Sequence, residues 1–460
     1  MNPAAERLVI FTRYPRPGKA KTRMIPLLGR RGAANLARRM IEHTFSWAGS
    51  LSFLRGVDVE VHCEGADERL MKNTFGNWGG RFRWHPQTDG DLGTKMGHAF
   101  LHAFSSGARS VVIVGTDIPD LEDRAVGRAF DMIAPDSCLS AGHHDIVLGP
   151  ARDGGYYLIG FTNRVPQRQI DGLLTDIPWG TDGVLEKTRG KAEKAGLSVG
   201  LLDVLDDVDL PQDLPVWRRA LERKQAGTAL ETISVIIPAL NEEGTVARTI
   251  ASARQTDRDV EIIVVDGGSA DKTAAVARAS GAVVAESPPP RSRQMNAGAR
   301  TARGDVLVFL HADTGLPPSY DRCIFEALSR PGAVAGAFEL GINGKGLPLR
   351  LVECMANMRS HVFQMPYGDQ GLFIGAALFY EIGGFEEIPI MDDFELMRRL
   401  KKRGTVAVAP LPVVTSGRRW HKMGVIKTTL INQAVIAAYL LGVSPERIAR
   451  WYRREEGIGT

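Results

Sequence analysis

Two stretches decide the fold of this chain: VVIVGTDIP at residues 111–119 and VLVFLHADT at residues 306–314. Each begins as an uninterrupted apolar run, which predicts a strand buried on both faces of a parallel sheet, and ends in a polar turn with an aspartate. Ligands of open α/β sheets bind beyond the carboxyl ends of the strands, so Asp117 and Asp313 are expected beside a nucleotide or its metal ion. The alternative for either residue alone is a cap of the next helix or turn. The occurrence of the pattern in both halves, with further motifs around it, favours the ligand role.

On either side of these stretches, apolar runs alternate with helical periodicity, which is typical of an α/β fold with a mostly parallel sheet flanked by helices. In the first half we expect three strands and one helix, at Leu8–Thr12, Val57–Cys63, Ser110–Gly115 and Gly32–Phe45 respectively. In the second half we expect three strands and two helices, at Ile233–Ile237, Val260–Asp266 and Val306–Leu310, and from Asp271 and Pro318. The sequence therefore predicts two Rossmann-like domains in tandem.

The length of 460 residues supports this division, because single cores tend to split beyond roughly 250–300 residues. The polar segment ERKQAGTALE at residues 222–231 separates the two halves. We place the first domain at residues 1–225, a linker at 226–231 and the second domain at 232–460. Hydrophobic residues make up 44% and charged residues 24%, a globular composition that excludes a largely disordered scaffold.

The charge balance and the cysteines exclude other classes. The formal charge of +4 and the lack of a Lys/Arg tract give no reason to expect a nucleic-acid partner. The four cysteines form no CxxC pair, so they suggest neither a zinc site nor a disulfide framework, and a cytoplasmic location fits. A five-residue apolar run near the N-terminus is too short for a signal peptide. The segment Val425–Val443 is interrupted by Lys427, Asn432 and Gln433, so we expect a core helix or a peripheral helix at the inner membrane surface.

Three motifs follow one another in the second half: ISVIIPALNEEG at 233–244, EIIVVDGGSADKT at 261–273 and RSRQMNAGAR at 291–300. In this order they resemble the GT-A fold of the family 2 glycosyltransferases, and more narrowly the rSAM/selenodomain-associated transferases, type 2. The resemblance implies a nucleotide-sugar donor. It also implies a nucleoside pocket, formed by the turn Pro238–Glu242 and by Glu242, Asp266, Gln294 and Asn296. Gly267 stands where the family usually has a second Asp, which leaves the nucleobase open.

The sequence His311-Ala312-Asp313 takes the place of the family's Asp-x-Asp. A divalent ion bridging the two phosphates of a nucleotide sugar neutralises the charge that grows on the leaving diphosphate. The resemblance implies that Asp313 is a ligand for Mg or Mn, and that Ala312 lies in the donor-binding segment. His311 removes one oxygen ligand, and its alternative is a histidine satisfied by a backbone carbonyl.

Two later segments, PYGDQGLFI at 366–374 and PIMDDFE at 389–395, complete the resemblance. It implies that Asp369 and Gln370 line the sugar and acceptor cleft. Inverting transfer needs a carboxylate that deprotonates the acceptor hydroxyl, and we assign Asp393, with Asp392 beside it to raise its pKa. The alternative is that both acids only favour the helix dipole. The basic segment RRWHKMG at 418–424 suits a diphosphate clamp, a solvated turn or an anionic-lipid contact.

The first half places a basic loop, PRPGKAKTRM at residues 15–24, directly after its first strand. Together with GTDIPDL, LGPARDGGYYLIG, IPWGTDGVLEKT and DDVDLPQDL, it resembles the rSAM/selenodomain-associated transferases, type 1, which are distant relatives of nucleotidyltransferases. The resemblance implies that Asp117 and Asp209 are metal ligands. It also implies a phosphate-binding loop with Gly18, Lys21 and Arg23, and a substrate pocket shaped by Asp153 and Tyr156. Nucleotidyl transfer, another transferase activity and a scaffold role all remain open for this half.

The leading hypothesis is an inverting, metal-dependent glycosyltransferase of the hexosyltransferase type, fused to a nucleotide-binding transferase-like domain. It would move a sugar from a nucleotide-sugar donor to a small-molecule or lipid acceptor. One alternative is a bifunctional enzyme whose first half is an active nucleotidyltransferase. Another is a nucleotide-binding protein without catalysis, against which the retained Asp313 and Asp393 argue, because binding alone needs no base.

Overall fold

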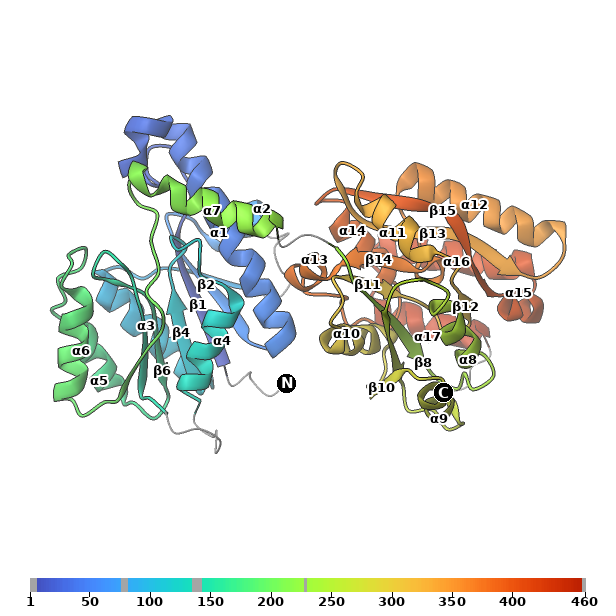
Figure 1. Cartoon of the computed structure of the whole chain (residues 1–460), viewed down its shortest axis with the longest axis horizontal. Helices are drawn as coiled ribbons and strands as arrows, with labels where there is room; N and C mark the ends of the chain where they lie inside the picture. The colour runs from blue at the N-terminus through green and yellow to red at the C-terminus, as the bar shows by residue number, and fades with distance from the viewer. Residues whose placement is uncertain (1–5, 76–81, 135–142, 227–229, 457–460) are drawn as a thin grey trace. The chain divides into compact units, whose positions relative to one another are not determined.

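A computed structural model of the chain describes residues 6–75, 82–134, 143–226 and 230–456 (Figure 1). It divides into two compact units with the main boundary at residues 229–230. Part of the predicted linker, residues 227–229, and Cys138 lie outside the described residues.

The first unit is built on a sheet with the strand order β3-β2-β1-β4-β6-β5-β7 in the described residues. Its strands are β1 (Glu6–Arg13), β2 (Asp58–Glu64), β3 (Arg83–Pro86), β4 (Ser110–Val114), β5 (Ile146–Pro150), β6 (Tyr156–Thr162) and β7 (Val199–Leu201). Its helices are α1 (Ile25–Arg55), α2 (Glu68–Phe75), α3 (Leu92–Ser105), α4 (Asp123–Met132), α5 (Gln167–Leu174), α6 (Val184–Lys194) and α7 (Leu214–Ala226).

The second unit is built on a sheet with the strand order β10-β9-β8-β11-β14-β13-β15-β12 in its described part. The strands are β8 (Ile233–Ala239), β9 (Val260–Asp266), β10 (Val283–Glu286), β11 (Val306–Phe309), β12 (Thr314–Gly315), β13 (Ala333–Asn343), β14 (Leu372–Gly375) and β15 (Thr405–Ser416). The helices are α8 (Val246–Ala253), α9 (Thr273–Ala279), α10 (Arg291–Thr301), α11 (Tyr320–Leu328), α12 (Leu347–Phe363), α13 (Ala376–Glu381), α14 (Asp392–Leu400), α15 (Arg418–Met423), α16 (Val425–Leu440) and α17 (Pro445–Glu456).

Both sheets have the same topology apart from the added β12. In the first unit β1 is parallel to β2 and β4, β6 is antiparallel to β4 and β5, and β7 is parallel to β5. The second unit repeats these relations with β8, β9, β11, β14, β13 and β15. The strand order therefore reverses at β1/β4 and at β8/β11, which are the switch points where α/β sheets bind ligands.

The apolar runs form buried strands because helices cover both faces of each sheet (Figure 1). In the first unit, Leu8 and Ile10 pack in the same cluster as Phe45 of α1, whereas Val9 packs in the cluster of Phe100 of α3. Each such fully buried side chain contributes about 1.5–3 kcal/mol. In the second unit β8 is buried along its whole length, with α8 and α11 among the helices that cover one face. The prediction of two α/β domains with mostly parallel sheets is confirmed.

The expected elements are found with small shifts at their ends. The helix expected at Gly32–Phe45 is the central part of α1, which bends at Gly29, where φ is 68°. The helix expected from Asp271 begins two residues later, because the Asp271 carboxylate accepts a hydrogen bond from the backbone N–H of Thr273 (2.9 Å). Val425–Leu440 forms α16, and in the described part of the chain no helix is long and apolar enough to cross a bilayer.

Candidate functional site

The site of the second unit begins where β8, β9 and β11 end. These three neighbouring strands are parallel, so the residues that follow them meet at one edge of the sheet. The turn after β11 carries His311 and Asp313, and it is held by the pairing of β12 with β15, including a 3.0 Å hydrogen bond from Thr314 to Thr415. Because β15 ends shortly before α15, the same pairing brings Arg418 to Asp313.

Arg418 joins the two acids of this edge. Its guanidinium binds both carboxylate oxygens of Glu242, with Nη1 2.9 Å from Oε2, and lies 3.3 Å from Oδ2 of Asp313. Burial raises the pKa of Asp313, and Glu242 adds to the rise, while Arg418 opposes it. Two carboxylates thus face one cationic group, the guanidinium of Arg418 from the basic segment.

The donor set at this place fits a divalent metal ion. Mg²⁺ and Mn²⁺ prefer oxygen ligands, and Asp313 and Glu242 both present carboxylate oxygens to the position that the Arg418 guanidinium takes. His311 is outside this set, because its Nε2 lies 2.8 Å from Nη1 of Arg291. Burial, together with Arg291, lowers the pKa of His311 to about 3, so the imidazole is neutral. Its partner is a side chain, and not the backbone carbonyl considered from the sequence.

Arg291, at the start of α10, is the centre of a second group of charges that sequence analysis did not single out. Besides His311 it binds Oδ1 of Asp392 (2.8 Å) and lies 3.9 Å from Oδ2 of Asp393. Burial alone would lower the pKa of Arg291, but Asp392 and Asp393 raise it above its ordinary value. Two sequence features could have pointed to it. His311 and the pair Asp392–Asp393 had no assigned cationic partner, and the RSRQMNAG motif contains an arginine that could supply one.

The acidic pair at the start of α14 divides into a buried and a more accessible carboxylate. The Asp392 side chain is 4% exposed, its Oδ2 has no hydrogen-bond partner, and burial raises its pKa. Asp393 is 16% exposed and accepts hydrogen bonds from the backbone N–H of Gly368 (2.7 Å) and of Phe394 (2.7 Å). Asp393 also lines a small cavity with Arg291 and His311. The two acids therefore differ in what they can reach.

Asp369 belongs to the same group, whereas Gln370 does not face it. Asp369 is close enough to Asp393 for their charges to interact, its Oδ1 has no hydrogen-bond partner, and burial raises its pKa. Gln370 is fully buried, and its amide bonds Arg359, Ser360, the Tyr367 N–H and the Phe338 carbonyl. Gln370 thus orders the loop that presents Asp369.

The other residues predicted for the donor pocket take several positions. Asp266 is buried and caps its own turn, accepting bonds from the N–H groups of Gly268 and Ser269 (3.0 Å each). Gln294 is buried against this turn, so close to Gly267 that a side chain there would collide with its amide. Asn296 is not brought to the site. Its amide nitrogen donates to the Phe385 carbonyl, and its amide oxygen accepts from the Phe385 N–H.

Two backbone positions of the predicted pocket lie at the strand ends. Pro238 is in β8 and lines the small cavity beside Arg291 and Asp393. Ala312 is buried, and its carbonyl accepts a 2.9 Å hydrogen bond from Thr249 of α8. This hydrogen bond anchors the turn that carries Asp313 to α8.

The first unit has its site at the corresponding edge. A cavity of about 480 Å³ lies beyond β1 and β4, lined by Lys21, Arg23, Asp117 and Asp209 among others. A neighbouring cavity of about 270 Å³ shares Asp117 and is lined by Asp153 and Tyr156. Gly18 lies outside both linings and has a φ of 80°, which a side chain would strain. The structure thus brings together the remaining predicted residues of this half.

The cations and acids of this cavity bind one another. Lys21 Nζ lies 2.8 Å from Oδ1 of Asp117 and 3.8 Å from Oδ1 of Asp209, and Arg23 Nη1 lies 2.6 Å from Oδ2 of Asp209. The Lys21 side chain is only 6% exposed, and its ammonium also donates to the Val208 carbonyl. The predicted phosphate contacts and the predicted metal ligands are therefore paired in the same cavity.

The two units place opposite charges at matching strand ends. After the fourth strand of the topology each has an aspartate, Asp117 or Asp313, that faces a cation. In the first unit that cation, Lys21, follows the first strand, and an acid follows β7. In the second unit the acid Glu242 follows the first strand, and the cation Arg418 follows β15. The fold thus defines two α/β units of the GT-A type, each with paired opposite charges at its strand ends.

The comparison with known families identifies the two parts. Residues 234–381 match the family described as Glycosyl transferase family 2. Residues 50–181 match DUF2064, described as an uncharacterized protein conserved in bacteria. The chain therefore contains a DUF2064 domain followed by a family 2 glycosyltransferase domain.

Individual relatives align with parts of the second half. The 4,4'-diaponeurosporenoate glycosyltransferase of Staphylococcus haemolyticus is 35% identical over 105 residues, 21% of this chain and 28% of the relative. Glucosyl-3-phosphoglycerate synthase of Mycobacterium tuberculosis is 36% identical over 118 residues, 23% of this chain and 36% of the relative. The chain thus spans about a third of the length of these curated relatives.

Two solved structures were also compared. A protein of Desulfovibrio desulfuricans, provisionally named a nucleotide-diphospho-sugar transferase, is 30% identical, with a TM-score of 0.41, and the match covers 48% of this chain and 96% of that one. The mycobacterial synthase in complex with Mn²⁺, UDP and glucosyl-3-phosphoglycerate is 24% identical, with a TM-score of 0.30, and the match covers 46% and 82%.

Proposed function

We propose that residues 232–460 transfer a sugar from a nucleotide-sugar donor to an acceptor hydroxyl with inversion at the anomeric carbon. The observation that carries this proposal is the group of acids around Arg291, which gathers Asp369, Asp392 and Asp393 beside the strand end with His311 and Asp313. A base near the acceptor and a cation site near the diphosphate are the two requirements of this chemistry.

In the proposed step Asp393 takes the proton of the acceptor hydroxyl while the hydroxyl oxygen attacks the anomeric carbon. The bond from that carbon to the diphosphate oxygen breaks, and its electron pair leaves with the nucleoside diphosphate. Asp393 is favoured over Asp392 because it is the more accessible acid and lines the cavity. Asp392, buried against Arg291, is a positioning residue that holds the guanidinium beside His311.

The donor end of the site is proposed at Glu242, Asp266, Gln294 and Asp313. Asp313, with Glu242 nearby, would hold Mg²⁺ or Mn²⁺, and such an ion supplies neutralisation of the charge on the leaving diphosphate. If both acids held the ion, the planar fork of Arg418 would be available to contact the diphosphate. The position of Arg418 beside both acids supports the diphosphate-clamp interpretation of the basic segment.

The test is release of nucleoside diphosphate from a panel of nucleotide sugars with Mn²⁺ or Mg²⁺. Asp393→Ala should lower the rate by about 10²–10⁴-fold, the usual contribution of a general base. Asp313→Ala should abolish the metal dependence. Asp259→Ala is the matched control, because this exposed acid precedes β9 at the opposite edge of the sheet. A rate that Asp393→Ala leaves unchanged would refute the assignment of the base.

The acceptor is proposed to be lipid-borne, with the enzyme lying on an anionic membrane surface. One face of α12 exposes apolar side chains at helical spacing: Leu347, Leu351, Met355, Met358 and Val362. The helix α16 packs against α12 and exposes Ile426, Leu430 and Leu440. Exposed basic residues, Lys345, Arg350 and Lys427, adjoin this apolar surface. An apolar face with basic neighbours is the pattern of helices that lie in the headgroup region.

Sedimentation with vesicles tests this surface. The protein should sediment with vesicles of phosphatidylglycerol and phosphatidylcholine, and Leu351→Glu with Met358→Glu should abolish it. Arg322→Glu, an exposed charge change on α11, is the control. Equal recovery in the supernatant with and without vesicles would instead favour a small soluble acceptor.

For the first unit we propose nucleotide binding in the cavity at Lys21, with nucleotidyl transfer as the second candidate activity. The cavity volume and its paired cations and acids support a phosphate-bearing ligand with a metal ion. The test is pyrophosphate release from nucleoside triphosphates with sugar 1-phosphates, compared between the unaltered protein and Lys21→Ala. Binding without release would leave this unit a nucleotide-binding domain, and no binding would overturn the proposal.

A further inference from the structure

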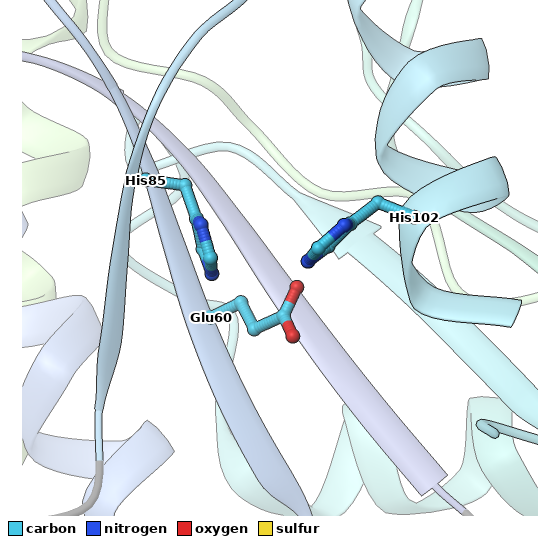
Figure 2. Close-up of side chains that lie close together, drawn as sticks. All are labelled: Glu60, His85 and His102. Atoms are coloured by element: carbon cyan, nitrogen blue, oxygen red, sulfur yellow. The ribbon is translucent and has the colours of Figure 1, made fainter. Parts of the chain in front are cut away.

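A second cluster of polar side chains lies in the first unit, on the part of the sheet that α3 covers. Ligand atoms of Glu60, His85 and His102 all lie within 4.8 Å of one another. Figure 2 shows that the three side chains, which come from β2, β3 and α3, converge on one point. None of them lines the two cavities of the proposed nucleotide site.

The register of the sheet explains how these residues meet. His85 of β3 is directly opposite His62 of β2, and Glu60 lies two residues before His62, so all three point to the same face. His102 reaches them from the last turn of α3. Glu60 is buried, His85 is half-buried and His102 is exposed, so the cluster leads from the interior to solvent.

The carboxylate of Glu60 uses its two oxygens differently. Oε1 is bound by Arg7 (3.1 Å) and Arg83 (3.3 Å), whereas Oε2 is buried without a hydrogen-bond partner. The imidazole of His62 lies beside Oε2, with its Nε2 3.6 Å away, and this nitrogen also lacks a hydrogen bond. Nε2 of His85 is buried and unpaired as well. Unpaired buried polar atoms are costly, so several around one point indicate a missing ligand.

The charges of the surroundings do not repel a cation. Arg7 and Arg83 are each paired with Asp58 as well as with Glu60, at 3.6 Å and 2.9 Å from Asp58, so two positive charges face two negative ones. The two imidazoles add nitrogen ligands. A dication can therefore enter without displacing an ion pair.

We propose that Glu60, His85 and His102 bind a divalent transition-metal ion of the Zn²⁺ type. Two imidazole nitrogens and one carboxylate oxygen form a ligand set that such ions prefer over Mg²⁺ or Ca²⁺. Ligands of a tetrahedral Zn²⁺ lie roughly 3.4 Å apart, so the three atoms have to move together by no more than about 1.4 Å. The exposed His102 provides that movement, and the unpaired Oε2 of Glu60 is free to serve as the carboxylate ligand.

The ion would tie β2, β3 and α3 together, and its fourth position would face solvent beside His102. This makes the site a structural or regulatory metal centre of the first unit, separate from Asp313 of the second unit. Of the cysteines in the described part of the chain, none belongs to this cluster.

The experiment uses the full chain after dialysis against a chelator. Zn²⁺ is titrated calorimetrically, and Co²⁺ is added as a probe whose visible absorption reports four-coordinate nitrogen and oxygen ligands. We expect one equivalent to bind, and His102→Ala to weaken binding by at least about 100-fold. His102 is exposed, so this variant should fold, and Glu60→Gln serves as the second variant. His98→Ala, an exposed histidine one turn earlier on α3, is the matched control.

Each outcome decides between the site and its alternatives. Unchanged affinity in His102→Ala, or an equal loss in His98→Ala, overturns the proposal. Loss of the bound equivalent in Asp313→Ala instead of His102→Ala would assign the ion to the second unit. Binding that does not saturate at one equivalent would mean surface histidines only.

Discussion

The pair of Arg291 and Asp392 offers the sharpest test of the second unit's site. Arg291→Met keeps the length of the side chain but removes the guanidinium that lies 2.8 Å from Asp392. Asp392 is 4% exposed, so its charge is left buried and unpaired, which typically costs 3–5 kcal/mol. The Arg291 side chain is 37% exposed, so solvent screens part of the interaction and we expect about 2–3 kcal/mol.

The assay is urea unfolding monitored by circular dichroism. Where the two units unfold in separate transitions, adding a ligand of one unit shows which transition belongs to that unit, because the ligand shifts it. A loss of 2–3 kcal/mol corresponds to a midpoint shift of roughly 1 M when the slope is about 2–3 kcal/mol/M. Burial raises the pKa of Asp392, so protonation at low pH relieves the unpaired charge, and the shift should be smaller at pH 5 than at pH 8.

A double-mutant cycle with Asp392→Asn completes the test. The double variant should be more stable than the sum of the two single changes predicts, by about 1–3 kcal/mol, because the residues are in contact. Additive effects, or a shift independent of pH, would refute the view that Arg291 compensates the buried acid.

Three further outcomes follow from single contacts. Burial lowers the pKa of His311 to about 3, so below about pH 6.5 this side chain takes up a proton when the protein unfolds. The free energy of unfolding should therefore fall by at most about 2 kcal/mol between pH 6.5 and 5. Urea unfolding at several pH values should show a smaller pH dependence in His311→Asn. Gly190→Ala in α6 has open space around the new methyl group and should raise the free energy of unfolding by up to about 1 kcal/mol, whereas Gly154→Ala, at φ 88° and against backbone, should lower it by more than that; urea unfolding measures both. Tyr320→Phe removes the 2.8 Å bond to the buried Ala253 carbonyl and should cost about 1–2 kcal/mol by thermal unfolding.

The two sheets and their ligand-binding edges could be predicted from local sequence patterns alone. Runs such as those of β4 and β8 have no polar face, so they are stable only between two layers of helices, and the polar residues that follow them meet at one edge. This placed Asp117, Lys21 and Asp313 at strand ends, where the structure has them. The order of motifs also identified the family 2 domain, which the family match confirms.

The tertiary structure decided which charges are partners. Arg291 binds Asp392 across 101 residues, and Arg418 binds Glu242 across 176, separations at which no local pattern survives. The antiparallel β6 and β14, which give both units one topology, were likewise not visible in apolar runs alone. The cluster of Glu60, His85 and His102 depends on strand register and on where a helix crosses the sheet. The local hydrophobic pattern predicts each helix or strand separately. Which buried polar atoms pair depends on how all of these elements pack together, because an unpaired polar atom in the core is costly.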